Sequence, residues 1–408
     1  MLPGRYTTHT HENLVRLCGW MPFERAVETL AGILGVRISP SSAIRMTEKA
    51  GAAYVALQTE AVAELERQAP KAPAGAEQMV FSGDGAMVPV LHGEWKEVRT
   101  LVIGEVRTSP AGETHSEALS YFSRLASAEE FTRLTLVETH RRGLENSQQV
   151  GAVVDGAEWL QGLIDYHVPQ AVRILDFAHA AQRLSAIALS LPTSAEPAPS
   201  ARIEQWRRQL KEEGAHGILQ ELHSLHAQYS DNQVLAEHLA YLEKRTDQMC
   251  YPQFIKQGWP IGSGIVESAN KLVVEARLKG AGMHWQPAHV NPILALRNII
   301  CSGRWDEAWS QIEHRLRTDA YQHRCQSSQR RFNARRDKAR AAKLAKAHAA
   351  HPPSPLPVAT PPDSSPTDLP SISPSTHSHP TKRPAPDHPW RHSPIGRARY
   401  ASSPYAKN

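Results

Sequence analysis

The chain has 408 residues, 41% of them hydrophobic, which is enough for one large or two medium-sized domains with a core. Its four cysteines are far apart and form no Cys-x-x-Cys pair, which excludes a small disulfide framework and a cysteine zinc framework. No run of about 18 apolar residues occurs, and residues 1–13 lack an apolar signal core. These features predict a soluble, cytoplasmic protein with reduced thiols.

The formal net charge of +5 is unevenly distributed. Residues 320–408 hold 15 of the 46 basic and 4 of the 41 acidic residues, so this tail is +11 and the remaining body is −6. Because the body is acidic, any contact with phosphate there requires a local basic patch. Half of the 30 prolines fall in the last 58 residues together with many serines, so the tail is predicted to be basic and then disordered.

Residues 1–68 are predicted to form a helical region. Apolar side chains recur at spacings of three and four from Phe23 onward, and Gly35 interrupts the pattern. Ser39 and Pro40 are then expected as the N-cap and the first residue of a second helix. Two helices with a short link indicate a helix-turn-helix, with an ordinary helical hairpin as the alternative.

After a linker at 69–78, strand-like runs occur in hairpin order and are followed by a helix and a strand-helix-strand unit. This order predicts an α/β fold with a mixed sheet. A long helical and polar stretch then precedes a return to apolar segments. The expected parts are a core with its first part at 79–180, an all-helical insertion at 181–258, and a second part of the core at 259–319.

Three acids are the strongest candidates for chemistry. Asp84 and Asp155 each follow a strand-like run and precede a glycine, which favours a sharp turn at the end of a strand. Glu267 is predicted on a helix, pointing away from an apolar stripe that contains Ile265 and Leu272. Carboxylates carried in this way are suited to holding two Mg²⁺ ions about 3.5–4 Å apart, which support nuclease and strand-transfer chemistry. An ordinary turn is the alternative for each Asp-Gly pair.

Short segments in colinear order, over about residues 20–310, carry a resemblance to a known family. They are 83–89, 95–99, 155–159, 176–179, 262–268, 282–285, 296–297 and 302–305. With these segments the chain resembles a bacterial DDE transposase of the ISKra insertion-sequence family, which is distantly similar to Mutator-like transposases.

The resemblance implies an RNase H-like fold with an all-helical insertion between the second and third catalytic acids. It also implies that Asp84, Asp155 and Glu267 are the catalytic and metal-binding triad, with two Mg²⁺ or Mn²⁺ ions as cofactors. Asp176 and His179 match a (Cys/Asp)-x-x-His element, whose implied role is to support the active site or the scissile phosphate.

The implied function is metal-dependent cleavage and strand transfer at insertion-sequence ends. Expected partners are double-stranded DNA and further copies of the chain, without a membrane or a nucleotide cofactor, at the bacterial nucleoid. Arg277, Lys279 and Trp285 are candidates for contacting phosphate and stacking on a base. A solvated helix end with a core tryptophan is the alternative for these three residues.

Two other functions stay open at this point. One is a catalytically inactive or domesticated DNA-binding protein derived from a transposase. The other is a metal-free hydrolase such as a glycosidase, which would need two carboxylates about 5–9.5 Å apart. His223 and His226 match half of a zinc site, but no second pair accompanies them. Compared with the family, the chain begins close to the helix-turn-helix, so its end-recognition region is expected to be shortened.

Overall fold

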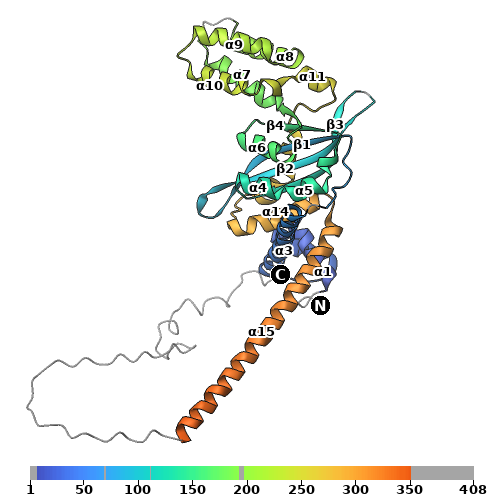
Figure 1. Cartoon of the computed structure of the whole chain (residues 1–408), viewed down its shortest axis with the longest axis vertical. Helices are drawn as coiled ribbons and strands as arrows, with labels where there is room; N and C mark the ends of the chain where they lie inside the picture. The colour runs from blue at the N-terminus through green and yellow to red at the C-terminus, as the bar shows by residue number, and fades with distance from the viewer. Residues whose placement is uncertain (1–6, 69, 111, 193–196, 351–408) are drawn as a thin grey trace, which may run out of the picture. The chain divides into compact units, whose positions relative to one another are not determined.

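One mixed sheet of five strands organises the folded part of the chain in this computed structural model (Figure 1). In sheet order the strands are β3 (Thr114–Arg124), β2 (Trp95–Thr108), β1 (Gln78–Pro89), β4 (Gln149–Val154) and β5 (Val172–Leu175). β2 runs antiparallel to β3 and β1, whereas β1, β4 and β5 are parallel. The predicted α/β fold with a mixed sheet is confirmed.

The structure describes residues 7–68, 70–110, 112–192 and 197–350. The predicted disordered region from residue 351 onward lies outside these ranges. Helix α15 (Trp305–Ala350) runs without a break through the expected start of the tail at residue 320. One compact unit ends at Arg336, and a second begins at Asp337. In the described ranges, no helix has the length and apolar character needed to cross a membrane.

The side chains of the sheet alternate between two faces, as the pleat of a strand requires. On one face Phe81, Leu101 and Phe122 pack against α4 (Ala128–Leu134) and α6 (Glu158–His167). Burying three side chains of this size stabilises the fold by roughly 1.5–3 kcal/mol each. Helices α4 and α6 therefore cover the face of the sheet opposite to the candidate acids.

The other face is covered by two groups of helices. Val80 and Val153 pack against the helical segment predicted for residues 181–258. Helix α7 (Phe177–Ser190) runs across the predicted start of this segment at residue 181. The rest of the segment consists of α8 (Pro199–Glu212), α9 (His216–Gln228), α10 (Gln233–Glu243), the 3₁₀ turn Thr246–Met249 and α11 (Tyr251–Lys256). Trp206 lies at its centre without solvent exposure, and its indole N–H donates to Glu221 at 2.9 Å.

The second group covers Val88, Val98 and Val102. It consists of α12 (Gly264–Ala269), the π-helical turn η4 (Asn270–Glu275), α13 (Ala276–Leu278) and α14 (Pro287–Cys301). Figure 1 shows the two groups at opposite ends of the sheet, with α14 next to α3 and α7–α11 together at the other end. Glu267 therefore lies on a helix, α12, that packs directly on the sheet.

Three N-terminal helices precede the sheet, namely α1 (Thr8–Trp20), α2 (Phe23–Leu34) and α3 (Pro40–Arg67). The predicted end of α2 and start of α3 are confirmed: Gly35 has φ 67°, and Ser39 caps α3 by accepting the Ser42 N–H at 3.3 Å. Helix α1 lies inside the predicted helical region 1–68, but the sequence did not predict it as a separate helix. α3 packs on α14 so closely that a Cβ on Gly51 would lie 2.1 Å from the Pro292 carbonyl oxygen.

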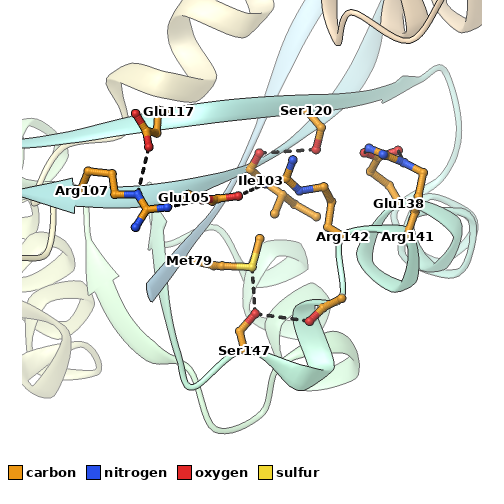
Figure 2. Close-up of polar contacts among 11 residues, drawn as sticks. Met79, Ile103, Glu105, Arg107, Glu117, Ser120, Glu138, Arg141, Arg142 and Ser147 are labelled. Atoms are coloured by element: carbon orange, nitrogen blue, oxygen red, sulfur yellow. Dashed lines mark hydrogen bonds and ion pairs between the residues drawn. The ribbon is translucent and has the colours of Figure 1, made fainter. Parts of the chain in front are cut away.

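A buried carboxylate joins the start of α15 to the sheet. Glu138 on α5 (Leu136–Arg141) is 1% exposed and pairs with Arg304 at 2.9 Å and with Arg141. Burial opposes its ionisation, but the charges of Arg304 and Arg141 hold the pKa of Glu138 below its ordinary value. Figure 2 shows Glu138 beside Arg141, and Arg107 of β2 between Glu105 and Glu117. Where the sequence predicted one helix after the first strands, the structure has two, because α4 ends at Leu134 and α5 begins at Leu136.

Candidate active site

Three aspartates follow one another across the parallel strands. The pairing of β1 with β4 reaches Phe81 and Ala152, and Asp84 and Asp155 each stand three residues further along the chain. β4 and β5 pair up to their last residues, after which Asp155 and Asp176 follow directly. The N–H of Asp176 donates to the last carbonyl of β4 at 2.7 Å, so the register continues beyond the strand end. The fold therefore aligns the two predicted aspartates at one end of the parallel strands.

Asp84 lies inside β1, so the predicted strand end and turn at Asp84-Gly85 were wrong. β1 continues to Pro89 because β2 pairs with it over that whole length, including Thr100 opposite Asp84. One carboxylate oxygen of Asp84 accepts the Gly85 N–H at 2.7 Å, and the other accepts the amide of Asn270 at 2.8 Å. Pairing across the sheet has overridden the local turn preference of an Asp-Gly pair.

Asp155 does stand at a turn, as predicted. Gly156 has φ 83°, a conformation that favours glycine, and a Cβ there would also meet the Tyr241 hydroxyl at 2.2 Å. The Asp155 side chain accepts the Ala157 N–H at 2.8 Å, and its carbonyl accepts the Tyr241 hydroxyl at 2.6 Å. Arg245 donates to the next carbonyl, that of Gly156, at 2.6 Å. Helix α10 and the turn after it therefore hold the Asp155 loop in place.

Asp176 caps α7 and binds His179. One of its oxygens accepts the His179 N–H at 3.0 Å and lies 2.6 Å from His179 Nδ1, while the other accepts the Ser263 N–H at 2.8 Å. Burial opposes ionisation of Asp176, yet the hydrogen bonds from His179 and Ser263 hold its pKa below the ordinary value. The hydrogen bond to Asp176 raises the pKa of His179, and the charges of Asp155 and Asp84 act in the same direction. Asp176 and His179 are therefore hydrogen-bonded to each other near the two aspartates, in an arrangement that favours the charged form of each.

Glu267 is exposed on α12. Two residues near it in the chain, Ser263 and Asn270, form hydrogen bonds with the aspartates. Ser263, which donates its N–H to Asp176, also points its hydroxyl at a Glu267 oxygen 3.4 Å away. One turn after Glu267, Asn270 donates to Asp84 at 2.8 Å. The helix that carries Glu267 is therefore bonded to both ends of the row of aspartates.

The predicted apolar stripe on this helix was partly wrong. Leu272 is 39% exposed, whereas Asn270 and Val274 are buried. The reason is the π-helical turn η4, which holds one more residue than an α-helical turn and so rotates the buried face. This rotation brings Asn270 to the sheet while Glu267 stays open to solvent.

Asp84 and Asp155 influence each other electrostatically. Burial raises the pKa of Asp84, the hydrogen bond from Gly85 opposes this, and the charge of Asp155 raises it further. The Oδ1 atom of Asn270, on the amide that binds Asp84, is buried and has no hydrogen-bond partner among the described residues. Two mutually repelling carboxylates are a partial donor set that suits a hard divalent cation.

Across the described residues, no three His, Cys, Asp or Glu side chains stand close enough together to hold a metal ion. Asp84, Asp155 and Glu267 therefore do not form a closed three-carboxylate cage in this structure. What the fold brings together is Asp84 with Asp155, and Glu267 stands on the adjoining helix turn.

The three residues predicted to contact DNA make other contacts in the structure. Arg277 is 1% exposed, donates to the Cys18 carbonyl at 2.8 Å and lies over the rings of Phe23 and Trp285. Trp285 is 8% exposed. Lys279 is bound to Glu275 at 2.7 Å. The prediction that Arg277 and Trp285 contact DNA was therefore wrong. Both side chains are buried and pack between α2 and the helices that follow Glu267.

Sequence reasoning missed two residues that belong to the site, Asn270 and Ser263. Both lie within four residues of Glu267, and both were inside the region already singled out. Their spacing of three and four from the acid is the signal that could have found them, because residues so spaced share one side of a helix. Their bonds to Asp84 and Asp176 depend on the tertiary fold.

Comparison with models of known protein families found no match, and comparison with curated proteins found none either.

Proposed function

We propose that the protein is a metal-dependent DNA transposase, which cleaves phosphodiester bonds at insertion-sequence ends and joins the 3′-hydroxyls to target DNA. The observation that supports this most is the alignment of Asp84 with Asp155, beside a helix that carries Glu267 and reaches Asp84 through Asn270. Two acids from the sheet and one from a later helix match the order of the triad implied by the family resemblance.

An RNase H-like core is part of this proposal. It is supported by the strand order β3-β2-β1-β4-β5, in which β2 alone runs against the others. Helices α8–α11 stand between the second and third acids, as the family resemblance implies. We also assign α2 and α3 to a helix-turn-helix, supported by the short link at Gly35 and by exposed Arg25 and Arg45.

The chemistry follows from the donor set. Asp84, Asp155 and Glu267 would hold Mg²⁺ or Mn²⁺, which prefer oxygen ligands, and the Asn270 amide would position Asp84. Bound there, two such ions would lower the pKa of the attacking water and stabilise charge on the leaving oxygen. His179, whose pKa is raised by its hydrogen bond with Asp176, is suited in its charged form to binding a phosphate oxygen. Water and then a DNA hydroxyl serve as nucleophiles, so no protein–DNA covalent bond is needed.

The test is nicking of supercoiled plasmid by the full chain, with Mg²⁺ and with EDTA. Asp84→Asn and Asp155→Asn keep the shape of the side chain and remove its charge. We expect cleavage to fall by on the order of 10³-fold, because a preorganised charge is lost at the reacting phosphate. Asp231→Asn, at an exposed position before α10, is the matched control and should cleave normally.

Three results would contradict the proposal in different ways. Full cleavage by Asp84→Asn excludes the triad. DNA binding without Mg²⁺-dependent nicking by the unaltered chain indicates an inactive DNA-binding protein instead. Hydrolysis of a glycosidic substrate that persists in EDTA indicates the carboxylate-pair hydrolase, which requires no metal.

A further inference from the structure

The middle of α15 is a basic surface that the candidate active site does not use. Its residues 321–336 contain five arginines and no acid. The arginines are Arg324, Arg330, Arg331, Arg335 and Arg336, and all are exposed. Earlier in the same helix the arginines are neutralised, since Arg315 pairs with Glu60 at 2.8 Å and Arg317 with Glu313 at 2.7 Å.

Three of the five arginines form a row. Arg324, Arg331 and Arg335 are spaced by seven and four residues, which places them on one side of an α-helix. In the described parts of the chain, no acidic side chain forms an ion pair with any of these three. The row spans about 16 Å, at about 1.5 Å per residue. That length matches about five nucleotide steps along one strand of B-DNA.

Two aromatic side chains flank the row. Tyr321 is 64% exposed and Phe332 is 61% exposed. They are eleven residues apart, close to three full turns, so they lie on nearly the same side of α15. Guanidinium groups bind phosphate, and exposed rings offer surfaces on which unpaired bases can stack.

We propose that this side of α15, which we call the arginine face (Tyr321, Arg324, Arg331, Phe332 and Arg335), binds the phosphate backbone of DNA. A second copy of the same face is a poor partner, because close like charges repel. A lipid bilayer fits less well, because the residues between the two aromatics are mainly Gln, Ser and Arg. The choice of DNA among polyanions rests on the proposed function.

The experiment measures DNA binding by the full chain in EDTA, using fluorescence anisotropy with labelled duplex and single-stranded 30-mers. The variant is R324Q/R331Q/R335Q. The control is R207Q/R208Q/K211Q, which removes the same three charges from exposed positions on α8. Because all six positions are exposed, both proteins are expected to fold, and circular dichroism with thermal unfolding verifies this.

We expect the arginine-face variant to bind duplex DNA at least about tenfold more weakly at 100 mM salt. The slope of log K against log salt should become shallower by about 0.9 for each phosphate that the variant no longer neutralises. The control should change affinity less than about twofold. Weaker binding of the single-stranded probe alone would still support the face and identify unpaired DNA as its ligand, with Phe332→Ala then weakening binding.

Equal decreases in affinity for the variant and the control would overturn the proposal, because they would show an effect of net charge alone. Unchanged affinity and slope in the arginine-face variant would overturn it as well. Preferential binding of anionic phosphatidylserine vesicles over DNA would assign the face to a membrane instead. Since the assay contains no Mg²⁺, its failure is separate from failure of cleavage.

Discussion

The charged form of His179 is favoured by a buried neighbour, Asp176. Its hydrogen bond with Asp176 raises the pKa of His179 above the ordinary 6.5, and the hydrogen bonds on Asp176 keep that carboxyl's pKa low. A raised histidine pKa contributes stability that is fully present below about pH 6.5 and is lost as the pH rises through the folded-state pKa. The lowered pKa of Asp176 has its effect at acid pH. The stability that it contributes is lost as the pH falls through the folded-state pKa of Asp176.

Replacing His179 by Asn should therefore lower the free energy of unfolding more at pH 5.5 than at pH 9. Urea denaturation at the two pH values measures the difference. His314→Asn, at an exposed position of α15, is the control and should show no such dependence. An equal loss at both pH values would mean that the ion pair with Asp176 does not govern the stability contribution of His179.

Asn270 is the residue through which the helix meets Asp84. Asn270→Ala removes the amide that donates to Asp84 and the unsatisfied oxygen beside it. We expect the Mg²⁺ concentration for half-maximal nicking to rise about 10–100-fold, as is typical when a group supporting a metal ligand is removed. The control variant Asn13→Ala, on α1, should leave this Mg²⁺ concentration unchanged. If Asn270→Ala cleaves at the normal Mg²⁺ concentration, Asn270 is not part of the site.

At the scale of single elements, the sequence predicted local features better than paired ones. Gly35 and Ser39 were placed correctly because a helix end depends on the few residues around it. The turn at Asp84 was wrong because strand β2, which lies later in the chain, keeps β1 extended. The apolar stripe after Glu267 was wrong because a regular 3.6-residue period cannot reveal a π-helical turn. The two aspartates were found from sequence, whereas their alignment depends on strand register.

The close contact of α3 with α14 gives a second test at this scale. Gly51→Ala would place a methyl group 2.1 Å from the Pro292 carbonyl oxygen, so the helices must separate. We expect a loss of about 1–3 kcal/mol in the free energy of unfolding. Gly32→Ala in α2, where no atom lies within 4 Å, should instead stabilise by about 0.5–1 kcal/mol. Urea denaturation of both variants checks this, and equal effects would contradict the close approach.

At the scale of the whole molecule, metal binding should appear as thermal stability. Two carboxylates that repel each other near Asn270 destabilise the folded chain when no cation is bound. Mg²⁺ at about 100 times its dissociation constant should stabilise the protein by about 2.7 kcal/mol. We expect D84N/D155N to lose this response and to melt above the unaltered chain in EDTA. A Mg²⁺ shift retained by that variant, at matched ionic strength, would locate the cation elsewhere.

The first helix supplies hydrogen-bond acceptors to two buried arginines. The carbonyls of Cys18 and Gly19, at the end of α1, accept hydrogen bonds from Arg277 at 2.8 Å and Arg297 at 3.2 Å, and both guanidiniums are 1% exposed. A deletion variant that starts after Trp20 would remove these two acceptors, at a cost of about 1–3 kcal/mol for each buried donor left without a partner. Such a shortened polypeptide should misfold or aggregate as a whole, and should not persist as an intact catalyst that merely fails to locate its substrate.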